Sequence, residues 1–249
     1  MKDGLKKTRI LGITLARCGS KSVLEKNIRP ISGIPLIGYT ISEALKSQFL
    51  TRYIVSTDSS KIQQVAIEYG AECPFIRPKE FSTDDASSVS ALQHAVDWIE
   101  GQEGETYDFV VELMCTNPMK TVEDIDSSIE KLISTGADSV IAVHVLEDHH
   151  PARIKKIVND KIEDFCIQEV PESRRQDLKP NAYIRSGSIY ALKRNHLMID
   201  SRRYGSENSR PYILPFDRAV NIDTEIDFLI AEVLINKSKY NYILDNHDK

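Results

Sequence analysis

The sequence is poor in cysteine, has no long apolar run and shows no excess of positive charge. Its four cysteines, Cys18, Cys73, Cys115 and Cys166, stand far apart without a Cys-x-x-Cys pair, which disfavours a zinc site or a disulfide framework. No apolar stretch approaches the roughly 18 residues of a membrane-spanning helix. The formal net charge of −5 disfavours nucleic acid as a main partner. We therefore expect a cytoplasmic protein with reduced thiols that contacts neither membrane nor nucleic acid.

The common phosphate-binding motifs are also missing. The strand-like run 10–16 is followed by Arg17-Cys18-Gly19-Ser20-Lys21, which is Gly-Ser-Lys where a Walker A loop needs Gly-Lys-Ser/Thr, and no Gly-x-Gly-x-x-Gly follows. What is present is a group of cations, Arg17, Lys21 and Lys26, at the mouth of a predicted strand. Phosphorylated ligands are usually held at such a place, although cations of this kind can equally form a solvated surface group.

Alternating strand-like and helix-period segments through residue 145 predict an α/β fold with a doubly wound, mostly parallel sheet in the order β-α-β-α-β-α-β-α-β. Strands are expected at 10–16, 52–58, 109–114 and 139–145, and helices from 35, 59, 88 and 121. Ser59 and the pair Thr121 and Asp124 have the spacing of helix caps. We expect one domain over 8–249, with an excursion from the sheet at 146–180, a strand at 187–192 and a last helix after 221–227.

The opening motif resembles a known signature. Ala-Arg-x-Gly-Ser-Lys at 16–21 followed by Lys26-Asn27 is similar to the start of the acylneuraminate cytidylyltransferases, the CMP-sialic acid synthetases and their relatives. The resemblance covers about residues 9 to 235 and implies a Rossmann-like fold of the nucleotide-diphospho-sugar transferase type. By this resemblance the triphosphate and nucleotide are held by Arg17, Ser20, Lys21, Lys26 and Asn27. Of these, Arg17, Lys21 and Lys26 would stabilise the transferring phosphoryl group and the departing pyrophosphate.

A second block, Arg77-Pro78 followed by Asp84-Asp85-Ala86-Ser87-Ser88, reads by itself as a turn and a helix cap. In the family this pattern recognises cytosine, so the resemblance implies that Arg77, Ala86 and Ser88 contact the base. A site built to pair with polar groups rejects ligands that cannot match them.

A third block is Asn221-Ile222-Asp223. Considered alone, Asp223 could merely precede a helix N-terminus, where carboxylates are favoured. In the family two aspartates in Asp-x-Asp order bind Mg²⁺, and this chain has asparagine at the first position. The resemblance thus implies Mg²⁺ at Asp223 with help from the uncharged amide of Asn221, and makes a two-metal scheme doubtful.

A fourth group would recognise the sugar acid. The stretch from His149 to Arg153 resembles the family's His-His-Pro-x-Lys, while Arg175, Gln176 and Arg185 resemble later positions that reach the neighbouring subunit's site. The resemblance therefore implies a homodimer joined through 146–180. Arginine suits a carboxylate because it can bind both oxygens. The adjacent histidines are expected to be structural, since no further metal ligand stands nearby.

The stretch after the strand at 109–114 departs from the family. Where sialic acid synthetases have Gln-Pro-Thr-Ser-Pro, this chain has Met114-Cys115-Thr116-Asn117-Pro118. We expect Met114 and Thr116 to contact the sugar. An apolar thioether in place of an amide predicts a sugar other than N-acetylneuraminate, such as a legionaminic-type, pseudaminic-type or octulosonate acid.

The resemblance therefore implies an enzyme that transfers CMP from CTP to the anomeric hydroxyl of a 3-deoxy-2-ulosonic acid and releases pyrophosphate. No general base stands out. One alternative is a nucleotidyltransferase of the same fold with another sugar or base, such as a CMP-Kdo synthetase or a guanylyl enzyme. Another is a non-catalytic nucleotide-binding homologue, which Asn221 and Met114 would suit.

Overall fold

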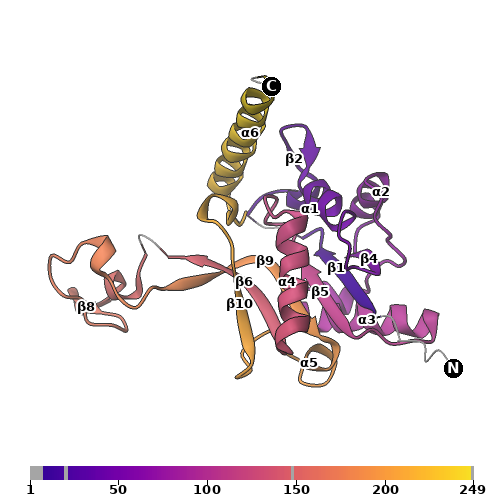
Figure 1. Ribbon diagram of the computed structural model, residues 1–249, viewed down its shortest axis with the longest axis horizontal. Helices are drawn as coiled ribbons and strands as arrows, with labels where there is room; N and C mark the ends of the chain where they lie inside the picture. The colour runs from indigo at the N-terminus through magenta and orange to yellow at the C-terminus, as the bar shows by residue number, and fades with distance from the viewer. Residues whose placement is uncertain (1–7, 20–21, 147–148, 248–249) are drawn as a thin grey trace.

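The central sheet has six strands, of which five run parallel and one runs against them (Figure 1). The computed structural model describes residues 8–19, 22–146 and 149–247. In spatial order the strands are β10 (Ser209–Ile213), β6 (Ser139–Val145), β9 (Tyr183–Lys193), β5 (Phe109–Leu113), β1 (Ile10–Ala16) and β4 (Arg52–Thr57). Two short hairpins pair β2 (Pro30–Ile31) with β3 (Ile34–Pro35) and β7 (Lys155–Val158) with β8 (Lys161–Asp164).

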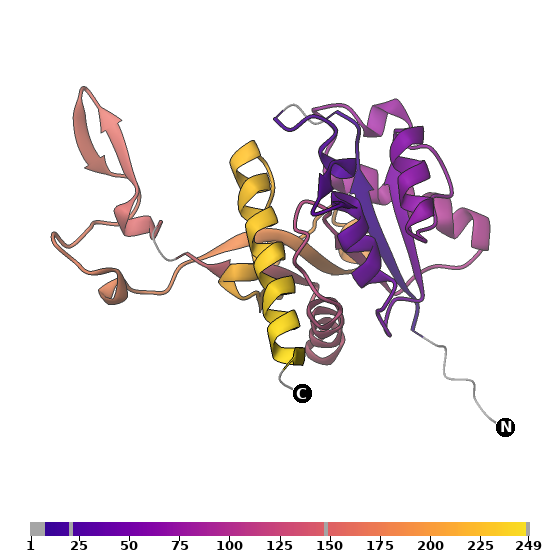
Figure 2. The same ribbon diagram turned by 90° about the horizontal axis from the view of Figure 1, so that it is seen from above.

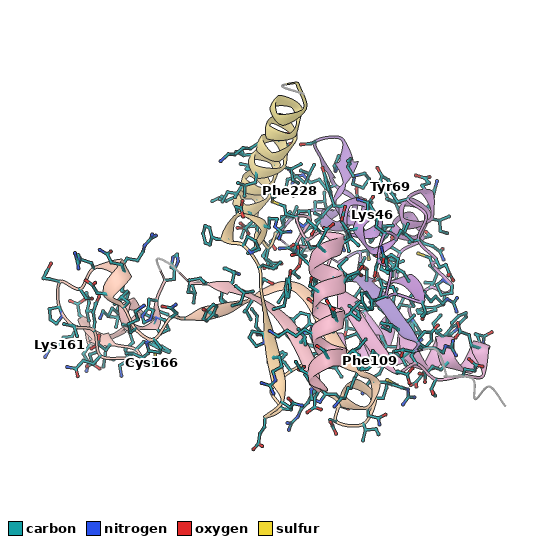
Figure 3. The ribbon with its side chains drawn as sticks, in the orientation of Figure 1. Lys46, Tyr69, Phe109, Lys161, Cys166 and Phe228 are labelled. Atoms are coloured by element: carbon teal, nitrogen blue, oxygen red, sulfur yellow. The ribbon has the colours of Figure 1, made fainter. Side chains whose placement is uncertain are left out.

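Helices cover both faces of the sheet, as the α/β pattern predicted. One face packs against α1 (Leu36–Ala44), α2 (Ser60–Glu68) and α4 (Val122–Thr135), and the other against α3 (Ser88–Glu103) and α5 (Arg194–Met198). The last helix, α6 (Glu225–His247), packs its first turns over a separate cluster that includes Ile31, Leu36 and Phe228. Figure 3 shows Phe228 where α6 meets the body of the protein. No helix in the described ranges is long and apolar enough to cross a bilayer.

Local sequence signals set the starts of these helices. Ser59 caps α2 by accepting a hydrogen bond from the backbone N–H of Ile62 at 3.3 Å. Thr121 and Asp124 form a reciprocal capping box at the start of α4. Both caps were predicted and are confirmed. Pro35 is the N-cap of α1, so the helix expected from residue 35 has Leu36 as its first helical residue.

The sheet differs from the expected order in two respects. No strand separates α2 from α3; the segment there makes only isolated bridges, Glu72 to Ile54 and Ile76 to Thr57. The strand expected at 187–192 is longer, because β9 begins at Tyr183, and it runs antiparallel between β5 and β6. Its direction follows from its path: the chain leaves β6 at Val145 and returns directly beside it at Tyr183, so it must run back.

Residues 149–182, here called the arm, project away from the sheet between the end of β6 and the start of β9 (Figures 1 and 2). The β7–β8 hairpin turns through Asn159 and Asp160, both of which have positive φ. Figure 3 places Lys161 and Cys166 far out on the arm. Large apolar side chains stay exposed along it: Ile157, Ile162, Phe165 and Val170. The excursion predicted at 146–180 is thus a separate lobe with little core of its own.

Short 3-10 helices complete the chain: η1 (Lys26–Ile28), η2 (Lys79–Phe81), η3 (Pro151–Arg153), η4 (Arg175–Asp177) and η5 (Phe216–Arg218). Of these, η1 follows the parallel strand β1, and η2 comes after α2, just beyond Ile76, which bridges Thr57 at the end of β4. Because the carboxyl ends of parallel strands meet at one sheet edge, the loops that follow them converge there.

Candidate active site

A cleft of about 420 Å³ lies at the edge of the sheet where β1 and β5 end. Its walls come from four separate parts of the chain: the loop after β1, the segment before α3, the end of β5 and the loop before α6. The predicted site residues that line it are Arg17, Lys26, Asn27, Arg77, Ala86, Ser88, Met114, Thr116 and Asp223. Ser20 and Lys21 lie outside the described residues. The fold thus brings four separate parts of the chain together at one cleft, although more than 200 residues separate Arg17 from Asp223.

The loop after β1 is tied to both neighbouring walls. Arg17 Nη1 donates to the carbonyl of Thr83 at 3.2 Å and to Asp84 Oδ1 at 2.8 Å. Asn27, which is buried, donates from Nδ2 to the carbonyl of Arg17 at 2.9 Å and accepts from Cys115 Sγ at 3.0 Å. Asn27 therefore fixes the loop to the end of β5.

Lys26 connects this loop to the segment before α6. Its Nζ donates to the carbonyl of Ile222 at 2.7 Å and to Asp223 Oδ1 at 3.2 Å. The Lys26 side chain is 12% exposed and that of Asp223 is 66% exposed. A cation held this way at the wall of a cleft can turn towards an anionic ligand without a large rearrangement.

Arg77 lines the cleft although it is only 4% exposed. Its Nε donates to Ser82 Oγ at 3.0 Å and its Nη1 to the carbonyl of Ser56 at 3.3 Å. Burial lowers the pKa of Arg77, and the nearby Asp58 partly opposes this. Ser87, not Ser88, is the N-cap of α3, accepting from the N–H of Ser90 at 3.0 Å. The segment thus serves as a helix cap and lines the cleft as well.

Asp223 and Asn221 are the candidate metal ligands. Asn221 Nδ2 donates to Asp223 Oδ2 at 2.5 Å, and its Oδ1 is buried without a hydrogen-bond partner in the described structure. The described residues contain no group of three or more His, Cys, Asp or Glu side chains placed to hold a metal. The exposed carboxylate of Asp223 fits a Mg²⁺ ion whose other ligands come from a bound triphosphate and water, whereas the orphaned amide oxygen of Asn221 faces Gly187 and would join the ion only after the side chain turned.

Gly187 supports this pair. It has a φ of +60°, and a Cβ added there would stand 3.1 Å from Asn221 Oδ1. Replacing Gly187 by alanine is expected to lower the free energy of unfolding by about 1 kcal/mol, because an L residue is strained at this φ and Asn221 must move. Urea denaturation measures this, and Gly101→Ala, in the interior of α3 with open space around it, is the matched control, expected to be neutral or stabilising. An unchanged midpoint for Gly187→Ala would contradict the prediction.

The remaining predicted sugar contacts do not reach this cleft. Arg153 Nη2 donates to the carbonyl of Ser173 within the arm, and Arg175 and Gln176 line a separate pocket of about 280 Å³ at the arm's base. Arg185 lies on β9, with its guanidinium 4.3 Å from the centre of the Tyr204 ring. The residues predicted to contact the sugar are therefore divided between the cleft, the arm and β9.

His150 holds the base of the arm together. It is 4% exposed; its Nε2 is 2.8 Å from the carbonyl of Pro180, and its Nδ1 accepts from the N–H of Ala152 at 3.2 Å. These contacts agree with the structural role expected for the His-His pair. His149 is exposed.

Two charged residues of the site were missed in the sequence. Glu112 lines the cleft while being 1% exposed, and Lys120 is equally buried behind the loop that carries Met114 and Thr116. Lys120 Nζ donates to Thr40 Oγ1 and the carbonyl of Met114, both at 2.8 Å, and to the carbonyl of Asn117. The sequence carried a signal for Glu112. It is a single charge inside the apolar strand run 109–113, and a charge is rarely placed in a buried strand without a specific partner.

Comparisons with known proteins agree with this geometry. A family model described as cytidylyltransferase matches residues 11–241. A pseudaminic acid cytidylyltransferase of Campylobacter jejuni is 32% identical over 225 residues, covering 90% of this chain and 95% of that protein. A CMP-N,N'-diacetyllegionaminic acid synthase of Legionella pneumophila is 30% identical over 237 residues, covering 91% and 96%. A CMP:2-keto-3-deoxy-manno-octonic acid synthetase solved with CTP shares the fold, with a TM-score of 0.67, 18% identity and coverage of 93% and 100%.

Proposed function

The chain belongs to the cytidylyltransferase family, and we propose that its sugar substrate is a nonulosonic acid of the pseudaminic or legionaminic type. The enzyme transfers CMP from CTP to such a sugar acid and releases pyrophosphate. The observation that carries the choice of sugar is Met114, whose apolar side chain lines the cleft where sialic acid synthetases typically have glutamine. Relatives named for pseudaminic and diacetyllegionaminic acid support the same choice.

The reaction joins the anomeric oxygen of the sugar to the α-phosphorus, releases the hydroxyl proton to water, and breaks the bond between that phosphorus and the oxygen bridging to the β-phosphate. Arg17 and Lys26, which both line the cleft from the loop after β1, would hold the triphosphate and stabilise the charge that develops on the departing pyrophosphate. The end of β5, with Met114 and Thr116, would hold the sugar. The described lining of the cleft contains no histidine that could act as a general base.

We propose Mg²⁺ as the cofactor, with Asp223 and the amide oxygen of Asn221 as its protein ligands. The metal would supply positive charge against the phosphate oxygens. Asn221 also orients Asp223 through its 2.5 Å hydrogen bond. Because Lys26 contacts the same carboxylate, Lys26 must share Asp223 with the metal or leave it when the nucleotide binds.

We further propose a cytoplasmic homodimer in which the arm of one subunit covers the cleft of the other. The exposed apolar side chains of the arm support an interface, since a projecting hairpin gains little by exposing them. Such a dimer would return Arg153, Arg175 and Gln176 to a sugar site. Light scattering at micromolar concentration tests it: a monomer that is nonetheless fully active would contradict this arrangement.

The reaction is tested by pyrophosphate release with CTP, Mg²⁺ and a panel of pseudaminic acid, N,N'-diacetyllegionaminic acid, N-acetylneuraminate and 3-deoxy-octulosonate. Each other nucleoside triphosphate is tried in place of CTP. Asp223→Ala should abolish most release, whereas Asp217→Ala, an exposed carboxylate outside the cleft, should not. Release with 3-deoxy-octulosonate alone would overturn the proposed sugar class, and CTP binding without release from any acid would favour a non-catalytic homologue.

A further inference from the structure

A buried ion pair forms part of the cleft wall. Glu112, on β5, lines the cleft, and Arg203 Nη1 donates to its Oε2 at 2.7 Å. The side chains of the pair are 2% and 18% exposed. Arg203 comes from the segment between α5 and β10, which none of the motifs of the family resemblance includes.

Aromatic rings hold Arg203 in place. Its guanidinium stacks on the ring of Tyr190 at 4.6 Å, and Tyr190 stands directly opposite Glu112 in the register of β5 and β9. Tyr204 lies beside Tyr190, with their ring centres 6.3 Å apart, and Arg185 stacks on Tyr204. The carboxylate of Glu112 is thus supported from the neighbouring strand as well as from the segment that carries Arg203.

Stability does not explain this pair. Burial raises the pKa of Glu112, and Arg203 opposes that shift. Replacing a buried ion pair by apolar side chains of similar volume is often neutral or stabilising, so such a pair is weak grounds for a purely structural role. Moreover, Glu112 Oε1 makes no hydrogen bond to any residue in the described ranges. The cleft therefore has a preorganised acceptor that the protein itself leaves unused.

The chemistry of this acceptor limits what it can bind. A carboxylate repels the triphosphate and the carboxylate of a sugar acid, so neither belongs beside Glu112. It attracts an N–H or O–H donor. Met114, two residues further along, lines the same cleft with an apolar thioether. An acylamino group matches both neighbours, with its N–H towards the carboxylate and its methyl group towards the thioether.

We propose that Glu112, held by Arg203, determines sugar specificity by accepting a hydrogen bond from an acylamino N–H of the sugar acid. The proposal rests on the proposed function and refines it. Sugar acids without an acylamino group leave Glu112 Oε1 without a donor and are rejected, since a site built to bind a donor discriminates strongly against an analogue that lacks it.

The test compares three variants with the wild type. Glu112→Gln keeps the shape but removes the charge. Glu112→Leu combined with Arg203→Leu removes the whole pair and leaves no buried charge unpaired. The control is Glu100→Leu with Arg194→Leu, a pair with two hydrogen bonds, at 2.8 and 2.6 Å, that joins α3 to α5 outside the cleft. Melting temperature checks folding, and KM is measured for CTP and for each acid, with 3-deoxy-octulosonate as the acid without an acylamino group.

Both Glu112 variants should raise KM for the acylamino acids by about 10- to 100-fold, the factor for losing a hydrogen bond to a charged acceptor. KM for CTP should change less than about twofold, because the lost hydrogen bond is one to the sugar acid and not to the nucleotide. The preference for acylamino acids over 3-deoxy-octulosonate should shrink by the same factor of about 10 to 100. The control pair should leave both KM values and the preference unchanged.

Two results overturn the proposal in distinguishable ways. If the wild type reacts with acylamino acids and both Glu112 variants keep its KM and its preference, the role of Glu112 is wrong while the proposed function stands. If the wild type binds CTP but reacts with no acid of the panel, the proposed function fails and the specificity role fails with it.

Discussion

Lys26→Met is expected to lower kcat/KM by about 10²- to 10³-fold, the usual effect of removing one preorganised donor from developing charge. Lys26 is the described cation that joins the loop after β1 to Asp223, so it stands where the triphosphate and its metal would meet. The steady-state rate of pyrophosphate release at varied CTP measures the effect. A fall in kcat as large as the fall in kcat/KM would show that the interaction forms mainly in the transition state.

The matched control is Lys61→Met. Lys61 forms an exposed ion pair with Glu25 at 2.6 Å and does not line the cleft, so its removal should change kcat/KM less than twofold. Melting temperature separates catalysis from folding, because Lys26 also donates to the carbonyl of Ile222. A folded Lys26→Met enzyme with near wild-type kcat/KM would contradict the proposed role.

Lys120→Met is expected to lower the free energy of unfolding by about 2–4 kcal/mol, since it removes a buried donor and leaves carbonyl oxygens unpaired. Those carbonyls belong to Met114 and Asn117, and Thr40 Oγ1 on α1 loses its contact as well. Because Met114 and Thr116 lie on the loop thus released, KM for the sugar acid should rise while KM for CTP changes little. Urea denaturation and steady-state kinetics measure the two effects.

The stability contributed by Lys120 should depend on pH. Burial lowers the pKa of Lys120 to about 7 from its ordinary 10.5, although Cys115, Asp124 and Glu43 oppose the shift. Between these two values the unfolded chain binds a proton that the folded chain does not, so this contribution rises with pH across the window and is lost as pH falls through 7. The difference in unfolding free energy between wild type and Lys120→Met should therefore be larger at pH 9.5 than at pH 7.

Lys131→Met is the control, because Lys131 is a partly exposed lysine that donates to the carbonyl of Pro211. Its effect on unfolding should be small and independent of pH. If the Lys120→Met difference instead shrank as pH rose, the buried amine would have to be charged throughout, and the sign argued above would be wrong.

Much of the fold could be predicted because its signals are local. The capping residues Ser59 and Thr121 and the apolar period of the helices depend on neighbours within a few residues, so they hold in any tertiary context. The meeting of Arg17, Arg77 and Asp223 at one cleft was implied by the family resemblance, since only Arg17 directly follows a parallel strand of the sheet.

The sequence by itself determined the α/β class, the starts of the main helices and many of the residues that line the cleft. Tertiary structure alone decided the direction of β9, since periodicity of two is the same for a parallel and an antiparallel strand. It also decided the partners of Glu112 and Lys120. Each of these charges is stabilised by groups distant in the chain, Arg203 for one and Thr40 for the other, and no local pattern encodes such a pairing.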